Sequence, residues 1–125
     1  MHRSTRLLFV SLAAAFAVGC GSSNSSTPAS PTPTPTVTGP SVSMVAGASL
    51  LTSTAYSPGS LTVARGSSVT FVNNDNTSHT ATASGQFDTG LINPGSSKTV
   101  TLSTAGTVTY HCTIHPGMTG TLIVQ

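Results

Sequence analysis

The sequence predicts an all-β fold, a β-sandwich of about seven to eight strands in one domain. From Ser41 onward, short runs of β-branched residues recur at intervals of roughly ten residues. Gly, Pro and Asn separate these runs, and no segment carries apolar residues at helical spacing. The 125 residues of the chain can enclose only one small core, so a second domain is not expected.

Seven segments have the composition and length of strands, and each is bounded by residues suited to turns. In chain order the expected strands are 42–45, 61–64, 68–73, 79–83, 98–102, 107–112 and 119–124. The turns between them are Ser57-Pro58-Gly59, Arg65-Gly66, Asn73-Asn74-Asp75-Asn76, Asn93-Pro94-Gly95 and Ala105-Gly106. Gly and Asn tolerate a positive φ and Pro fixes φ near about −65°, so these residues favour chain reversals.

The expected strand 107–112 has a regular alternation that orients its side chains. Val108, Tyr110 and Cys112 share one face, whereas His111 lies on the other. We therefore expect Cys112 to point into the core and His111 to point away from it. The aromatic residues Phe71, Phe87 and Tyr110 are expected in core and edge packing rather than in an electron relay.

The N-terminal segment has the features of an export signal. Arg3 and Arg6 precede an apolar run over 7–18, which is too short to span a bilayer but suits the core of a signal peptide. The run ends in Phe16-Ala17-Val18-Gly19-Cys20, which resembles the bacterial lipobox. We expect residues 1–19 to be a signal peptide and Cys20 to be lipidated. The alternative is ordinary cleavage near Gly19, which leaves a free Cys20.

Residues 20–40 are expected to form a linker, and residues 41–125 the folded domain. From Gly21 to Pro40 the chain is mostly Ser, Thr, Asn and Pro, with little to bury. The Pro-Thr alternation over 31–35 favours an extended stalk. The predicted protein is thus exported and held by its lipid anchor alone, facing the periplasm or the cell exterior.

The charges exclude several kinds of partner. The formal net charge is +2, but Arg3 and Arg6 lie in the expected signal peptide, which leaves two cations, Arg65 and Lys98, against two acidic residues. The mature balance is therefore zero. Such a chain cannot neutralise a row of phosphates, and it has no basic patch for anionic lipids, so no nucleic-acid binding is expected.

A group of possible metal ligands lies near the C-terminus. Cys112, His115 and Met118 recur every third residue, and once Cys20 is acylated Cys112 is the only thiol left, so no internal disulfide is possible. A further donor is His79, which follows the polar turn 73–78. Two His, one Cys and a weak axial Met are the donors of a blue-copper centre. Without metal, Cys112 would be a small buried hydrophobe and Met118 a filler of core space.

The segment Tyr110-His111-Cys112-Thr113-Ile114-His115-Pro116-Gly117-Met118 resembles the copper loop of the cupredoxins, and is closest to the short-loop amicyanin type. The likeness extends back over Leu61 and the segments 69–75 and 87–90, and forward to Val124. It implies a Greek-key sandwich that binds one copper ion, Cu(I) or Cu(II), per chain. His79, Cys112 and His115 would be the equatorial ligands and Met118 the axial one, whereas His111 is not expected to ligate.

The resemblance also predicts residues that support the ligands. Many relatives have Asn directly after the upstream His, where it braces the copper loop, but this chain has Thr80. Thr113 resembles the residue that hydrogen-bonds near the ligand loops. We therefore expect Thr80 and Thr113 to lie directly behind the ligands.

The expected function is a one-electron carrier, with redox partner proteins docking weakly near His115 on a monomeric chain. The alternatives are copper storage or delivery and a structural β-sandwich module without a redox role. An enzyme is not expected, because the chain has no Glu and its two acidic residues, Asp75 and Asp88, are far apart in the sequence.

Overall fold

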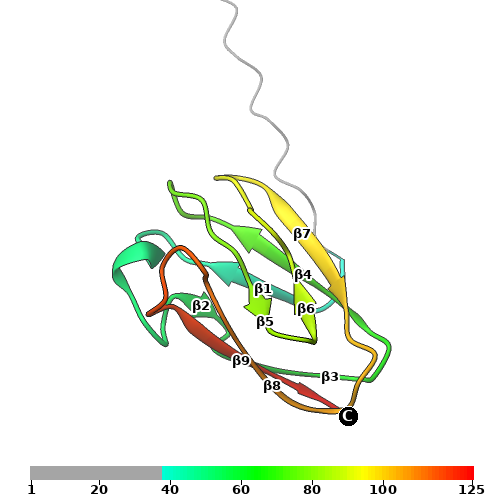
Figure 1. Cartoon of the computed structure of the whole chain (residues 1–125). Coiled ribbons are helices and arrows are strands. Elements are labelled where there is room, and N and C mark those ends of the chain that lie inside the picture. Colours follow the sequence, from blue (N-terminus) through cyan, green and yellow to red (C-terminus); the bar gives the residue numbers. More distant parts are fainter. Residues whose placement is uncertain (1–37) are drawn as a thin grey trace, which may run out of the picture. The chain divides into compact units, whose positions relative to one another are not determined.

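Two β-sheets packed face to face form the part of the chain that the structure, a computed structural model, describes, residues 38–125 (Figure 1). The predicted signal peptide and most of the predicted linker lie outside these residues. The elements in chain order are β1 (Ser41–Met44), the short 3-10 helix η1 (Ala48–Leu50), β2 (Tyr56–Ser57), β3 (Ser60–Val63), β4 (Ser68–Asn73), β5 (Thr82–Ala83), β6 (Phe87–Asp88), β7 (Ser97–Thr101), β8 (Gly106–His111) and β9 (Thr119–Val124).

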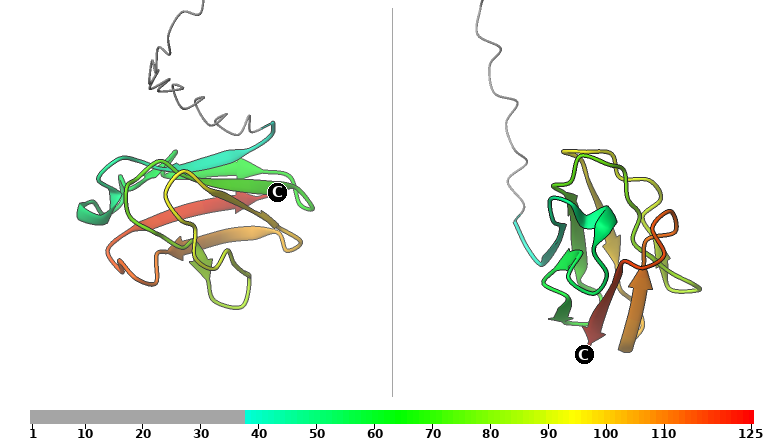
Figure 2. Two further views of the ribbon diagram at one scale, coloured as in Figure 1. Left: turned by 90° about the horizontal axis from the view of Figure 1, so that it is seen from above. Right: turned by 90° about the vertical axis from the view of Figure 1, so that its left-hand side faces the viewer.

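Each sheet contains both parallel and antiparallel pairs of strands. One sheet has the order β2-β1-β4-β7 and the other β3-β9-β8-β5-β6. The pairs β1–β4 and β3–β9 are parallel and the remaining pairs are antiparallel. The left view of Figure 2 shows the two layers edge-on. Among residues 38–125 no helix has the length and apolar character needed to cross a membrane.

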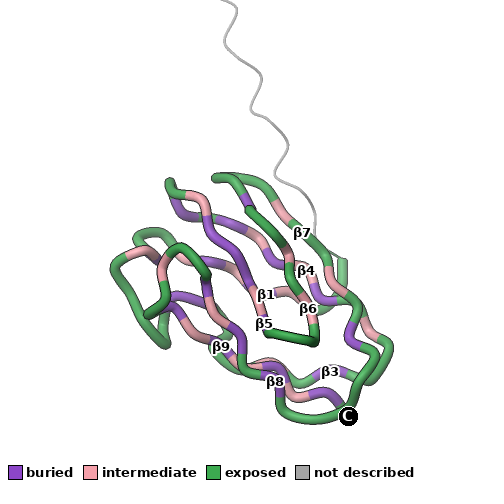
Figure 3. Tube along the Cα trace, viewed as in Figure 1, coloured by how far each residue is buried: buried purple, intermediate pink, exposed green. Residues whose placement is uncertain are grey.

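The core lies between the sheets because every second side chain of the central strands points inward. Buried and less buried residues alternate along β4 and along β9, as the two-residue period of a strand requires (Figure 3). Phe71 and Tyr110 are fully buried, and Phe87 packs on both rings from the edge of the sheet. The predicted core and edge packing of these aromatic residues is confirmed.

The predicted fold class is confirmed, and most predicted strands are shifted by no more than one residue. The prediction for 79–83 was wrong, because only Thr82 and Ala83 belong to a strand. His79 instead forms an isolated bridge with Ile92 and stands apart from the sheet. The two-residue strands β2 and β6 were missed, since segments that short show no periodicity.

The topology brings two connections together at one end of the sandwich. The first joins β4 to β5 and contains His79, and the second is the loop 112–118 between β8 and β9. The backbone N–H of Thr80 donates to the Cys112 Sγ atom, and the N–H of Thr113 donates to the Thr80 hydroxyl. These contacts fix the two connections against each other.

Candidate metal centre

His79 is held by the polar turn that precedes it. The Asn73 side-chain amide donates to the carbonyls of Thr77 and Ile92, at 2.7 and 2.9 Å, and its Oδ1 accepts from the N–H of Asp75 at 2.9 Å. His79 and Ile92 exchange two backbone hydrogen bonds of 3.1 and 2.7 Å. These bonds close the turn and direct the fully buried His79 ring into the space between the two connections.

The loop 112–118 is closed by its own backbone. Cys112 N–H donates to the Met118 carbonyl at 3.1 Å, and Met118 N–H donates to the His115 carbonyl at 2.9 Å. Cys112 and Met118 are fully buried, whereas His115 is partly exposed. The loop therefore gathers a thiol, an imidazole and a thioether beside His79, and only the imidazole of His115 reaches the surface.

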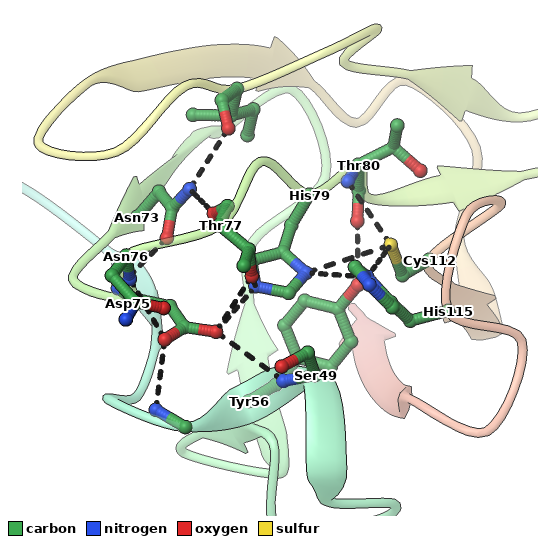
Figure 4. Close-up of polar contacts among 12 residues, drawn as sticks. Ser49, Tyr56, Asn73, Asp75, Asn76, Thr77, His79, Thr80, Cys112 and His115 are labelled. Atoms are coloured by element: carbon green, nitrogen blue, oxygen red, sulfur yellow. Dashed lines mark hydrogen bonds and ion pairs between the residues drawn. The ribbon is translucent and has the colours of Figure 1, made fainter.

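Three donor atoms of these residues converge on one point. The His79 Nδ1 atom lies 3.8 Å from the Cys112 Sγ atom and 3.1 Å from the His115 Nδ1 atom, and the His115 Nδ1 atom lies 3.7 Å from the same sulfur. All three atoms lie within 4.8 Å of one another (Figure 4). His111 is not part of this group within residues 38–125.

The opposite nitrogen of the His79 ring is bound to Asp75, a residue that the sequence reasoning missed. The Asp75 carboxylate accepts from His79 Nε2–H at 2.8 Å. Its other donors are the N–H groups of Gly47 (2.9 Å), Asn76 (2.8 Å) and Ser49 (3.3 Å) and the Thr77 hydroxyl (3.0 Å). Burial alone would raise the pKa of Asp75, but these hydrogen bonds, that from His79 foremost, hold it well below its usual range.

This carboxylate decides which His79 nitrogen can bind a metal. An ionised carboxylate only accepts hydrogen bonds, so Nε2 carries the proton and Nδ1 keeps its lone pair, directed at Cys112 and His115. A carboxylate behind a ligating histidine is a common feature of metal sites, because it fixes the tautomer and the ring orientation. The sequence offered one sign of this role, because Asp75 is the only acidic residue in the polar turn 73–78 and lies four positions before His79.

Thr80 and Thr113, the two residues expected to support the ligands, lie against Cys112 and against each other. The Thr80 N–H donates to the Cys112 sulfur at 3.3 Å. The Thr80 hydroxyl accepts from the Thr113 N–H at 2.9 Å and lies 3.2 Å from the Thr113 hydroxyl. A threonine hydroxyl thus joins the two connections at the position where many relatives have Asn.

The chemistry of the donors fits a single copper ion. A thiolate and a thioether are soft ligands that suit Cu(I), and imidazole suits both oxidation states. Asp75 keeps the proton of the buried His79 ring on Nε2, so the lone pair of Nδ1 is available to bind the metal. His79, Cys112, His115 and Met118 would hold the copper.

Comparison with known proteins agrees with this geometry. The purple cupredoxin of Nitrosopumilus maritimus is 23% identical, with a TM-score of 0.65 over 70% of this chain and 100% of that one. A reduced Cu(I) form of an amicyanin variant at pH 4 is 24% identical, with a TM-score of 0.59 over 72% of this chain and 87% of the other. Another reduced amicyanin variant is 29% identical over 54% of this chain and 70% of that one, with a TM-score of 0.50. Among curated proteins no significant match was found.

The family model for the cupredoxin-like domain matches residues 11–124, which is most of the chain. The match agrees with the two-sheet fold, with the grouping of His79, Cys112 and His115, and with the expectation that the chain is not an enzyme. The chain therefore belongs to the cupredoxin-like family and carries a site for one copper ion.

Proposed function

We propose that the chain is a one-electron carrier with a type 1 copper centre, in which His79, Cys112 and His115 are the equatorial ligands and Met118 is the axial one. The observation that carries this proposal is the convergence of one sulfur and two imidazole nitrogens within 4.8 Å, from two connections fixed to each other. Bound copper would supply the Cu(II)/Cu(I) couple. The protein residues supply a fixed geometry around it.

Rigid support of the ligands favours fast electron transfer, since little rearrangement then accompanies a change of charge. Asp75 fixes the His79 ring, and the Thr80 N–H fixes the Cys112 sulfur. The backbone bonds among Cys112, His115 and Met118 close the loop. All these contacts are present in the chain itself, so the site is prepared before any partner binds.

The accessible edge of the site is His115, which lies in a shallow groove. One wall is the segment 49–52 at η1 and the other is the segment 114–117. Leu50 is 89% exposed and Ile114 is 50% exposed, and no residue of this lining is acidic or carries Lys or Arg. Redox partner proteins would dock here weakly and through apolar contact, with the electron leaving through the His115 ring. Figure 1 shows η1 beside the β8–β9 loop.

Burial favours the carrier over a copper-delivery protein. His79, Cys112 and Met118 are fully buried, so an acceptor protein could reach the metal only past His115. A delivery protein needs ligands that an acceptor can replace one at a time. Rapid reversible reduction of tightly held copper would support the carrier, and ready transfer of Cu(I) to a competing chelator would support delivery.

The decisive experiment is to add Cu(II) to the purified chain and record its visible spectrum. An intense blue thiolate-to-copper band is expected, and Cys112→Ser should abolish it. His115→Gln should also lose the band, whereas His111→Gln, which changes the histidine next to Cys112 but outside the cluster, should keep it. A colourless wild-type protein would refute the proposal.

The location of the protein is a separate proposal that is supported by sequence alone. Cys20 would carry the lipid anchor, and residues 21–40 would lift the domain from the periplasmic or outer face of a membrane. Mass spectrometry of the membrane fraction should find an acylated Cys20 as the N-terminal residue. Cys20→Ser should release the protein from the membrane, and retention of that variant would contradict the proposal.

A further inference from the structure

Tyr56 is buried beside the site and forms one hydrogen bond to Thr80, the residue that follows His79. It comes from β2, the edge strand of its sheet, and is only 1% exposed. Its ring packs edge-on against Tyr110, with 4.9 Å between the ring centroids. Its hydroxyl donates to the Thr80 carbonyl at 2.6 Å, a short bond for two neutral groups (Figure 4).

The bond from Tyr56 acts on the residue that contacts the Cys112 sulfur. Three groups of Thr80 are hydrogen-bonded. Its N–H donates to the Cys112 sulfur, its hydroxyl accepts from the Thr113 N–H in the loop, and its carbonyl accepts from the Tyr56 hydroxyl. The first two contacts both draw Thr80 toward the loop. The Tyr56 bond fixes the carbonyl group of the same residue, so it limits how far the Thr80 N–H can move away from the sulfur.

The chemical state of Tyr56 suits this role. Burial, with smaller contributions from Cys112 and Tyr110, raises the pKa of Tyr56 far above its usual value. The phenol therefore stays protonated and remains a hydrogen-bond donor. Loss of the hydroxyl would leave the Thr80 carbonyl without this partner in a buried place, so the Thr80 backbone would be expected to shift.

We propose that Tyr56 is a positioning residue that sets the Thr80 N–H hydrogen bond to the Cys112 sulfur and, through it, the reduction potential of the site. An N–H dipole that points at the sulfur favours the more electron-rich reduced state, so hydrogen bonds to this sulfur help to set the potential. A loosened bond should lower the potential. The effect on the reduction potential rests on the copper site proposed above, whereas the effect on the Thr80 N–H concerns the metal-free chain.

Tyr110 provides a matched control, because the chain has only two tyrosines and both are buried against each other. The Tyr110 hydroxyl has no hydrogen-bond partner among residues 38–125. Tyr56→Phe and Tyr110→Phe therefore remove the same atom from neighbouring core positions. Only Tyr56→Phe removes a bond to Thr80.

The first test uses amide hydrogen exchange of the full chain without metal, followed by NMR. In Tyr56→Phe the Thr80 amide should exchange about tenfold faster relative to the amides of β9, which corresponds to about 1.4 kcal/mol for one buried hydrogen bond. In Tyr110→Phe this ratio should not change. Equal Thr80 exchange in the two variants would overturn the positioning role, whether or not the chain binds copper.

The second test measures the reduction potential of the copper-loaded chain by voltammetry. Tyr56→Phe should lower the potential and shift the thiolate-to-copper band, whereas Tyr110→Phe should change neither. If Tyr56→Phe does not fold, 3-fluorotyrosine can be incorporated into Tyr110→Phe, where position 56 is the only site for it. The fluorinated phenol is more acidic and is therefore a stronger hydrogen-bond donor to the Thr80 carbonyl. It should hold the Thr80 N–H more firmly at the sulfur and so raise the reduction potential. An unchanged potential there, or equal potentials in the two Phe variants, would refute the link to the sulfur.

Discussion

Replacing Asp75 with Asn tests the support of His79 most directly, since the substitution keeps the shape and removes the charge. The two carboxylate oxygens have different donors. One accepts from the backbone N–H groups of Gly47 and Asn76, and the other accepts from His79 and Thr77, with a longer contact to a backbone N–H. A backbone N–H can only donate, whereas a hydroxyl and an imidazole can each also accept.

This difference predicts how the new amide would turn. Its oxygen should face the N–H groups of Gly47 and Asn76, and its NH₂ group should face His79 and Thr77. The His79 Nε2 atom would then accept a hydrogen bond, and the proton would move to Nδ1, the atom that faces Cys112 and His115. Metal binding would have to reverse this tautomer. Loss of such supporting groups typically weakens metal binding by about 10–100-fold, or about 1.4–2.8 kcal/mol.

The assay is competition for copper against a chelator of known affinity, read from the visible band of the full chain. Asp88→Asn is the matched control, because Asp88 is the only other acidic residue and its carboxylate accepts from Thr82 and Gly90 at the surface. Its copper affinity should stay close to that of the wild type. If Asp75→Asn bound copper as tightly as Asp88→Asn, the proposed role of Asp75 would be wrong.

Three further predictions concern the stability of the metal-free chain, measured by urea unfolding. Thr80→Val should cost about 1–3 kcal/mol, because the Thr113 N–H loses the hydroxyl that accepts its hydrogen bond. Burial raises the pKa of both Tyr56 and Tyr110, so the folded state keeps protons that the unfolded chain releases above about pH 10. The contribution of the two tyrosines to stability should therefore be level below that pH and fall above it, by up to about 1.4 kcal/mol per pH unit for each tyrosine. Gly120→Ala should cost about 1–3 kcal/mol, since the added Cβ would overlap the Tyr110 ring and hydroxyl.

Each of these predictions has an internal control. Thr70→Val removes a hydroxyl paired with Thr99 at the surface and should have a small effect, so equal losses for positions 70 and 80 would contradict the first prediction. Tyr110→Phe should halve the alkaline slope, and an unchanged slope would contradict the second. Gly117→Ala adds a Cβ that makes ordinary contact with Thr52, so the third fails if position 120 tolerates Ala as well as position 117 does.

Much of the fold and of the site could be predicted because the information is local. The two-residue period of 107–112 placed Cys112 in the core, and the three-residue spacing to His115 and Met118 indicated one short loop. The place of His79 after the polar turn 73–78 made it a further candidate donor, and the resemblance to the cupredoxins then implied its role as a ligand. The strand expected at 79–83 was wrong because β-branched composition cannot show that His79 leaves the sheet to pair with Ile92.

The sequence by itself determined the fold class and the donor types, since strand periodicity and the chemistry of Cys, His and Met act within a few residues. Only the tertiary structure decided what stands behind the ligands. Asp75 reaches His79 because the turn closes on Asn73, and Tyr56 on β2 reaches Thr80 in the connection between β4 and β5, 24 positions away in sequence. Such contacts depend on the packing of two sheets, and neither the spacing nor the composition of a segment specifies them.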